Sequence, residues 1–147
     1  MASYAPEGRL HKLLRYARVF YAWRLRGGAA PGYLPEDISI ELTNTCNFRC
    51  AFCPQSDPAH FDIVTRTSLE PERARELLLK LRAAGVRTDV LHWTLDGEPF
   101  VNRQIGEICG IAIEFGFKNF IFSTNGYFCT ADRLAELPRG DGDVRYQ

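Results

Sequence analysis

The sequence lacks the features that place a protein across or outside a membrane. No stretch of its 147 residues approaches the roughly 18 consecutive apolar residues of a membrane-spanning helix. The first 30 residues have neither the apolar run nor the small-residue cleavage site of a secretory signal. Internal repeats and low-complexity tracts are also missing. We therefore expect a cytoplasmic globular protein, for which 46% apolar and 24% charged residues are an ordinary composition.

Cysteine is scarce outside one short segment. The chain has five cysteines, and Cys46, Cys50 and Cys53 fall within the eight residues CNFRCAFC. In a reducing cytoplasm, clustered cysteines bind metals or act in catalysis more often than they form disulfides, and an odd count favours the same interpretation. Cys109 stands among isoleucines of a predicted helix, so we expect it in the core. Cys129 follows a predicted strand, and we interpret it as a buried bystander, with metal ligation as the alternative.

The net charge of zero hides an uneven distribution. Residues 1–35 hold six basic residues against one acidic residue, a net charge of +5, which leaves −5 for residues 36–147. Helical spacing over residues 9–26 predicts an amphipathic helix with one apolar stripe, formed by Leu10, Leu13, Leu14, Ala17, Phe20 and Tyr21. We expect this arm to pack on the rest of the protein or on a partner. Contact with an anionic membrane surface is the alternative, and no nucleic-acid partner is expected.

After a Gly- and Pro-containing linker, strand and helix patterns alternate. Strands are predicted over 38–42, 90–95 and 118–126, and each is followed by a helical pattern, over 71–84, 102–115 and 130–137. Ser68, Asn102 and Thr130 are the expected N-caps, and Gly85 and Gly116 the expected stops of the first two helices. His92 is expected as a satisfied core residue. Three βα units of this kind predict an α/β fold with a parallel sheet or barrel.

Three polar motifs follow the three predicted strands. The cysteine loop comes directly after the first strand, DGEP (96–99) after the second, and STNG (123–126) ends the third. Parallel strands bring their carboxyl ends to one edge, where binding and catalytic residues gather. We therefore expect Glu98 and Asn125 to lie on the same face as the cysteine loop.

These motifs carry a resemblance to a known family. LTNTCNFRCAFCP resembles the CxxxCxxC loop of radical S-adenosylmethionine (SAM) enzymes, with the aromatic Phe52 before the last cysteine, and DGEP is similar to their GGEP motif. The resemblance covers roughly residues 36–137, on the fold logic above. ELTNTCN looks most like the branch that often carries a C-terminal auxiliary-cluster (SPASM) domain. Asp96 departs from the usual glycine of the family, which bears on the local backbone conformation.

The resemblance implies a cofactor pair and a set of ligands. Cys46, Cys50 and Cys53 would bind a [4Fe-4S] cluster and leave one iron open, which SAM would chelate. Gly97, Glu98 and Pro99 would fix a backbone edge that holds the methionine amino group. Ser123 and Asn125 would lie near the SAM carboxylate or the ribose, and Phe52 near the adenine. An external electron donor would reduce the cluster, and the 5′-deoxyadenosyl radical would abstract hydrogen from an unknown substrate, a peptide or a small-molecule precursor.

The predicted units amount to part of the resembled fold. Three βα units in residues 38–137 compare with about six in the open barrel of these enzymes, after an N-terminal helix and linker at 1–35. We interpret residues 36–147 as the N-terminal half of a radical SAM core, completed by a missing C-terminal half or a partner chain and inactive alone. The last residues are predicted to open a fourth strand, leaving the edge of NFIFS (119–123) unpaired.

A second class of function remains compatible with the cysteines. CxxxCxxC by itself also suits half of a zinc site or an electron-transfer cluster, and hence a non-enzymatic iron–sulfur or zinc protein. The number of ligands separates the two classes, because Cys129 as a fourth ligand would close the site. We predict that the sulfurs of Cys46, Cys50 and Cys53 converge on one point without a fourth protein ligand.

Overall fold

A computed structural model describes residues 37–139 and 144–146, with Leu34, Pro35 and eight positions of the N-terminal region (10, 13, 14, 16, 17, 20, 21 and 24). The chain divides into two units, Met1–Leu34 and Pro35–Gln147, one residue before the boundary that the sequence predicts. In the first unit the eight described positions are helical. Its large apolar side chains, Leu10 to Tyr21, are 58–70% exposed. Most basic residues of the predicted arm lie outside the described residues.

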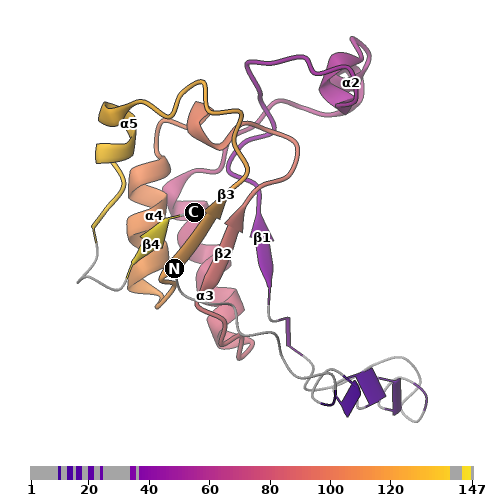
Figure 1. The fold of residues 1–147 in the computed structure, drawn as a ribbon, viewed down its shortest axis with the longest axis vertical. Coiled ribbons are helices and arrows are strands. Elements are labelled where there is room, and N and C mark those ends of the chain that lie inside the picture. Colours follow the sequence, from indigo (N-terminus) through magenta and orange to yellow (C-terminus); the bar gives the residue numbers. More distant parts are fainter. Residues whose placement is uncertain are drawn as a thin grey trace. The chain divides into compact units, whose positions relative to one another are not determined.

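The second unit is built on a parallel sheet. Its strands are β1 (Ile38–Ile40), β2 (Val90–Trp93), β3 (Asn119–Phe122) and β4 (Arg145–Tyr146), hydrogen-bonded in the order of the sequence (Figure 1). The predicted α/β class and its three βα units are therefore confirmed. The edge of β3 that faces away from β2 corrects one expectation. Asn119 and Phe120 pair there with β4, so on this edge only the second half of the strand lacks a partner among the described residues.

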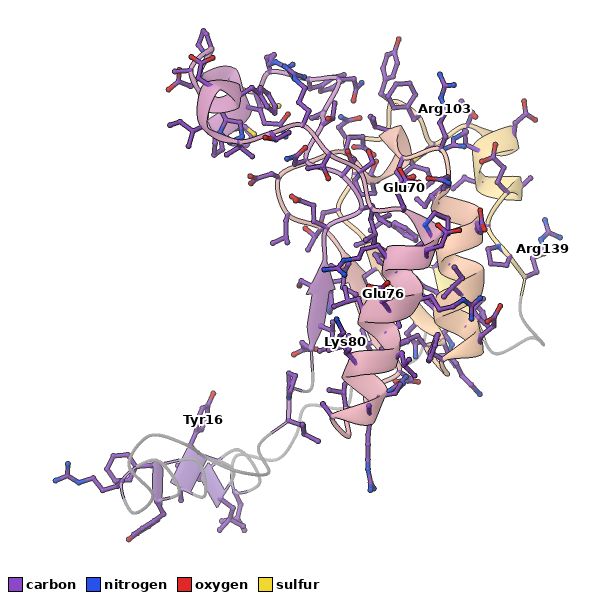
Figure 2. The ribbon with its side chains drawn as sticks, turned by 180° about the vertical axis from the view of Figure 1, so that it is seen from behind. Tyr16, Glu70, Glu76, Lys80, Arg103 and Arg139 are labelled. Atoms are coloured by element: carbon purple, nitrogen blue, oxygen red, sulfur yellow. The ribbon has the colours of Figure 1, made fainter. Side chains whose placement is uncertain are left out.

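The main helices are α3 (Pro71–Ala83) and α4 (Ile105–Glu114), followed by the short α5 (Ala131–Ala135). Helices α3 and α4 cover the same face of the sheet, as both views of the ribbon show (Figures 1 and 2). Figure 2 shows Glu76 and Lys80 on the exposed side of α3. Between β1 and α3 lie a 3₁₀ turn, η1 (Pro54–Ser56), and α2 (His60–Ile63), and a second 3₁₀ turn, η2 (Pro99–Val101), follows β2.

Helix ends follow the sequence signals in part. Gly85 and Gly116 adopt φ values of 92° and 82° and end α3 and α4, as predicted. Thr130 caps α5, since its Oγ1 accepts a hydrogen bond from Arg133 N at 3.3 Å. The other two expected caps are wrong. Ser68 donates to Thr43 Oγ1 instead, and α4 begins three residues after Asn102, whose side chain holds the loops at the sheet edge.

The core fills the space between the sheet and the two main helices. Leu91, Trp93 and Phe120 are fully buried there, and the Trp93 and Phe120 rings stack with centroids 6.2 Å apart. Cys109 is fully buried as expected, and desolvation raises the pKa of its thiol to about 12.

Alternation along β2 leaves the other face of the sheet more open. The expectation of a core His92 is wrong: its side chain is 30% exposed, and Nε2 lies 3.9 Å from Asp37 Oδ1. Because successive strand residues point to opposite faces, the apolar neighbours of His92 are buried while His92 itself is not. In the described part of the chain, no helix is long and apolar enough to span a membrane.

Candidate functional site

Three loops lie at the carboxyl edge of the sheet, one after each of the first three strands (Figure 1). They carry the cysteines, the DGEP segment and the STNG segment, respectively. Five polar side chains are buried in the described part of the chain, and all of them hold these loops: Thr43, Asn44, Gln55, Glu98 and Asn102. The geometry of the site follows from what each of them binds.

The cysteine loop is closed at its base by a polar neck. Asn44 Oδ1 accepts a hydrogen bond from Thr67 N at 2.8 Å, and Asn44 Nδ2 donates to Thr65 O at 2.7 Å. An isolated antiparallel bridge joins Thr43 to Ser68. The chain therefore leaves the sheet and returns to α3 at one place, with the cysteines and α2 in the loop between. Sequence reasoning missed this role of Asn44.

The three cysteines of the loop are free and partly exposed. A turn joins Cys53 N to Cys50 O at 2.9 Å, and Cys46 Sγ accepts a hydrogen bond from Phe48 N at 3.4 Å. The prediction of convergence is wrong for this structure: among the described residues, no group of three or more Cys, His, Asp or Glu side chains is arranged to hold a metal ion.

Gln55, two residues after the last cysteine, joins two of the loops. Its side chain is almost fully buried. Oε1 accepts a hydrogen bond from Cys46 N at 3.1 Å, and Nε2 donates to Asp96 O. One amide group thus connects the start of the cysteine loop to the DGEP segment. In the sequence, the one sign of this role is a glutamine that follows Cys53 and Pro54, and the sequence-based predictions missed it.

The DGEP segment packs its backbone directly on the neck. Glu98 N donates to Thr45 O at 3.0 Å, and a Cβ placed on Gly97 would stand 1.7 Å from Thr43 O. Only glycine allows this close approach. Asp96, which stands where the resembled family usually has glycine, does not have a positive φ. The residue before it, Leu95, adopts a φ of 116°, a conformation that costs a non-glycine residue about 1–3 kcal/mol.

Glu98 ties the DGEP segment to the STNG segment. It is 2% exposed, and its carboxylate accepts hydrogen bonds from Thr124 Oγ1 at 2.7 Å, Asn125 N at 2.7 Å and Phe100 N at 3.2 Å. Such charge-assisted bonds are stronger than neutral ones. The carboxylate is therefore occupied by donors of this chain, and the edge that Gly97, Glu98 and Pro99 form is held in place by it.

Asn125 reaches the cysteine loop from the third strand. Its Nδ2 donates to Asn47 Oδ1 at 3.0 Å and lies 3.7 Å from Cys46 Sγ. Ser123 is exposed at the end of β3, where its N–H donates to Trp93 O at 3.2 Å. The structure thus brings Cys46, Glu98 and Asn125 together at one edge.

Aromatic side chains stand at the open side of this edge. Phe52 is 92% exposed, and the Phe48 and Tyr127 rings meet edge to face with centroids 5.9 Å apart. The contact links the cysteine loop to the STNG loop a second time. Cys129 is half-buried, and its Sγ lies 3.6 Å from Thr124 Oγ1.

The donor chemistry at this edge fits an iron–sulfur cluster in kind and number. Three free, partly exposed thiols on one loop are the usual ligands of such clusters, and three ligands leave one iron of a cubane open. The buried Cys109 is held protonated by its raised pKa and does not belong to this set.

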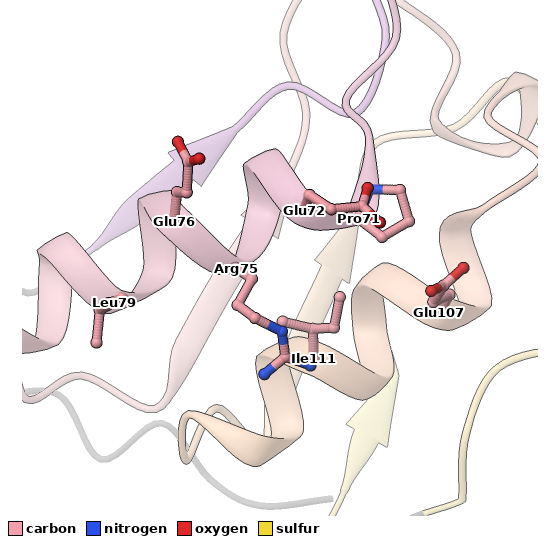
Figure 3. Close-up of a pocket in the computed structure, with 7 residues that line it drawn as sticks. All are labelled: Pro71, Glu72, Arg75, Glu76, Leu79, Glu107 and Ile111. Carbon is pink, nitrogen blue, oxygen red and sulfur yellow. The ribbon is translucent and has the colours of Figure 1, made fainter.

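A separate groove of about 540 Å³ lies between α3 and α4 (Figure 3). It is lined by charged side chains, among them Glu72, Glu76 and Glu107, and Arg75 forms an exposed ion pair with Glu114 at 2.7 Å across the two helices. None of the three loops lines this groove, so it is distinct from the site at the sheet edge.

Comparison with known proteins gives a consistent family. The model of the radical SAM superfamily matches residues 40–146. The probable GTP 3′,8-cyclase of Sulfolobus acidocaldarius is 34% identical over 95 residues, which cover 63% of this chain and 27% of that protein. The GTP 3′,8-cyclase of Aquifex aeolicus is 32% identical over 101 residues, covering 68% and 30%. The chain thus spans less than a third of the length of these relatives.

Solved structures show the same fold. BtrN in complex with AdoMet and 2-DOIA superposes with a TM-score of 0.59 at 23% identity, over 71% of this chain and 41% of that one. BtrN in an open conformation gives a TM-score of 0.58 at 23% identity, over 78% and 56%. The partial barrel predicted from the sequence is confirmed by these likenesses.

Proposed function

Because the chain belongs to the radical SAM superfamily, we propose that it forms the N-terminal part of a catalytic core that binds a [4Fe-4S] cluster and SAM. Cys46, Cys50 and Cys53 supply the thiolates, and one iron is left for SAM to chelate. The 97–99 edge takes the methionine amino group. Ser123 and Asn125 take the carboxylate or the ribose, and Phe52 packs by the adenine.

The observation that carries this proposal is the joining of three motif loops at one sheet edge. Gln55 links the cysteine loop to Asp96, and Glu98 links its own segment to Thr124 and Asn125. An electron-transfer or structural module needs only the cysteines. The additional organisation of the other two loops favours a site that binds a second molecule beside the cluster.

The bound cofactors supply one-electron cleavage of SAM to a 5′-deoxyadenosyl radical that abstracts hydrogen. The residues of this chain position the cofactors and shield them from water. Gly97 lets the edge approach Thr43, and Glu98 fixes that edge through three hydrogen bonds. The Phe48 and Tyr127 rings meet between two of the loops, and beside bound cofactors they would limit the access of water.

The substrate is left open in this proposal. Two relatives are named as acting on GTP, and one structural neighbour was crystallised with 2-DOIA. The likeness to the two relatives extends over about 100 residues, less than a third of their length. It therefore supports cofactor chemistry common to the superfamily rather than a particular substrate, which we place among peptides and small-molecule precursors.

We also propose which molecules the chain associates with. The rest of the barrel comes from a C-terminal continuation or a partner chain. It covers the edge of β3 that faces away from β2, where the residues after Phe120 have no strand partner among those described. An external donor supplies the electron. The 9–26 arm packs on a partner or binds an anionic membrane surface, and a cytoplasmic location suits an oxygen-sensitive cluster.

One experiment tests the proposal. The full-length protein is reconstituted anaerobically with iron and sulfide, reduced, mixed with SAM and assayed for iron content and 5′-deoxyadenosine. We expect about four irons per chain and cleavage of SAM. Cys46→Ala should lose both, whereas Cys129→Ala, the matched control, should retain both. Iron without SAM cleavage, or a bound zinc ion, would favour the non-enzymatic alternative.

A further inference from the structure

Gln55 occupies a place in the site that no motif assigns to it. Its side chain is 2% exposed. Among the described residues, Gln55 and Glu98 are the two polar side chains that are less than 3% exposed and connect different loops. Buried polar groups must be hydrogen-bonded, and Gln55 uses both ends of its amide, one as acceptor and one as donor.

The donor end reaches Asp96, a residue whose backbone is held at both its N–H and its carbonyl. Asp96 O accepts the hydrogen bond from Gln55 Nε2, and Asp96 N donates to Glu41 Oε1 at 2.9 Å. The residue before it, Leu95, is the one non-glycine residue with positive φ in the described part of the chain. Strained conformations persist where the surroundings over-determine them, and here two side chains do so.

The acceptor end reaches the first cysteine. Cys46 N donates to Gln55 Oε1, and Gln55 itself follows the last cysteine by two residues. From its place at the end of the cysteine loop, the Gln55 side chain therefore contacts the beginning of that loop and the start of the DGEP segment. The nearest replacements do not keep both bonds: glutamate lacks the donor, leucine lacks both ends, and asparagine is one methylene shorter.

We propose that Gln55 is a positioning residue that sets the distance between the cluster-binding loop and the edge that binds the methionine part of SAM. This inference rests on the proposed function. A ligand that chelates an iron and contacts the DGEP edge at once must match that distance, so a shift of one loop relative to the other weakens SAM binding while the three thiolates stay in place.

The test compares Gln55→Glu and Gln55→Leu with Gln104→Leu as the matched control. Gln104 lies at the start of α4, five residues after the DGEP segment. Hydrogen exchange of the iron-free protein is the first measurement. Gln55→Leu should raise exchange at Cys46 N, whereas Gln55→Glu, which keeps an acceptor there, should leave it protected. Unchanged exchange in Gln55→Leu would show that the hydrogen bond to Cys46 does not hold the loop and would overturn the proposal.

The second measurement uses the reconstituted full-length protein. We expect both variants to keep the iron content of the native protein, to raise the KM for SAM about tenfold, and to alter the change that SAM causes in the electron paramagnetic resonance spectrum of the reduced cluster. Loss of iron in Gln55→Glu, or an unchanged KM and spectrum in both variants, would overturn the proposal. Failure of the native protein to cleave SAM would instead refute the proposed function.

Discussion

The carboxyl edge of the sheet separates two regions, the core and the site loops, and different interactions hold each of them together. Below it, between the strands and helices α3 and α4, buried side chains are apolar and pack around Trp93 and Phe120. Above it, in the loops, five buried side chains are polar, and each is hydrogen-bonded to the backbone of another segment. Packing is non-directional, whereas a hydrogen bond fixes distance and angle. The polar half is therefore the part that can set loop positions.

The largest expected effect lies in the apolar half. Trp93→Ala removes a fully buried ring from the stack on Phe120 and should lower the free energy of unfolding by about 3–5 kcal/mol. Urea titration followed by circular dichroism measures it. Trp93→Phe, which keeps a ring, should cost less than half as much. If the two variants lose the same free energy of unfolding, a specific contact of the indole, rather than packing, accounts for the loss.

Gly97→Ala should have the next largest effect and should break the polar half. The new Cβ would stand 1.7 Å from Thr43 O, so the DGEP backbone must move, at about 3 kcal/mol of stability. SAM affinity should fall with it, as equilibrium dialysis of the reconstituted protein would show. Gly110→Ala is the control, because its Cβ meets nothing nearer than Pro138 Cγ at 4.0 Å. An unchanged affinity in Gly97→Ala would contradict the assigned role of this edge.

Glu98→Gln sharpens the comparison without changing shape. The amide nitrogen of glutamine cannot accept from Thr124 or Asn125, so one donor loses its acceptor and the cost should be about 1–2 kcal/mol. The expected local signature is faster hydrogen exchange at Asn125 N. The exposed Glu72→Gln, in the first turn of α3, should cost less than about 1 kcal/mol of stability and leave exchange at Asn125 N unchanged. If the two variants behave alike, the carboxylate of Glu98 does not join the loops.

The smallest expected effect concerns the cysteines of the two halves. In the iron-free protein, Cys46, Cys50 and Cys53 are partly exposed and should react with iodoacetamide. Burial raises the pKa of Cys109 to about 12, which keeps it a thiol, so raising the pH from 7 to 9 should not label it. Mass spectrometry of tryptic peptides reads the result. Labelling of Cys109 before unfolding would show that the core opens locally.

The sequence-based predictions succeeded where the signal is local and periodic. The strands, the helix stops at Gly85 and Gly116, and the buried Cys109 all follow from patterns within a few residues. Each predicted strand was too long at its carboxyl end, because the residues after Ile40 and Trp93 leave the sheet to build the site loops.

The residues that organise the site could not be found in this way. Gln55 bonds to a residue 41 positions away, and Asn44 to one 21 positions away. A polar residue in a loop carries no periodic signature, and its partner is defined only by the fold. The positions of the three sulfurs were mispredicted for a related reason: the spacing of cysteines fixes which residues are near, but not which hydrogen bonds orient their side chains.

The neck formed by Asn44 has a consequence for how the loop above it can change. The chain enters and leaves this loop at the bridge between Thr43 and Ser68. The number of residues in the loop therefore does not alter the spacing of the strands. Helix α2 lies in this loop, with Ile63 87% exposed. Residues inserted or exchanged at α2 would give the protein new recognition surface, or a site for a spectroscopic label, while the neck keeps the sheet register intact.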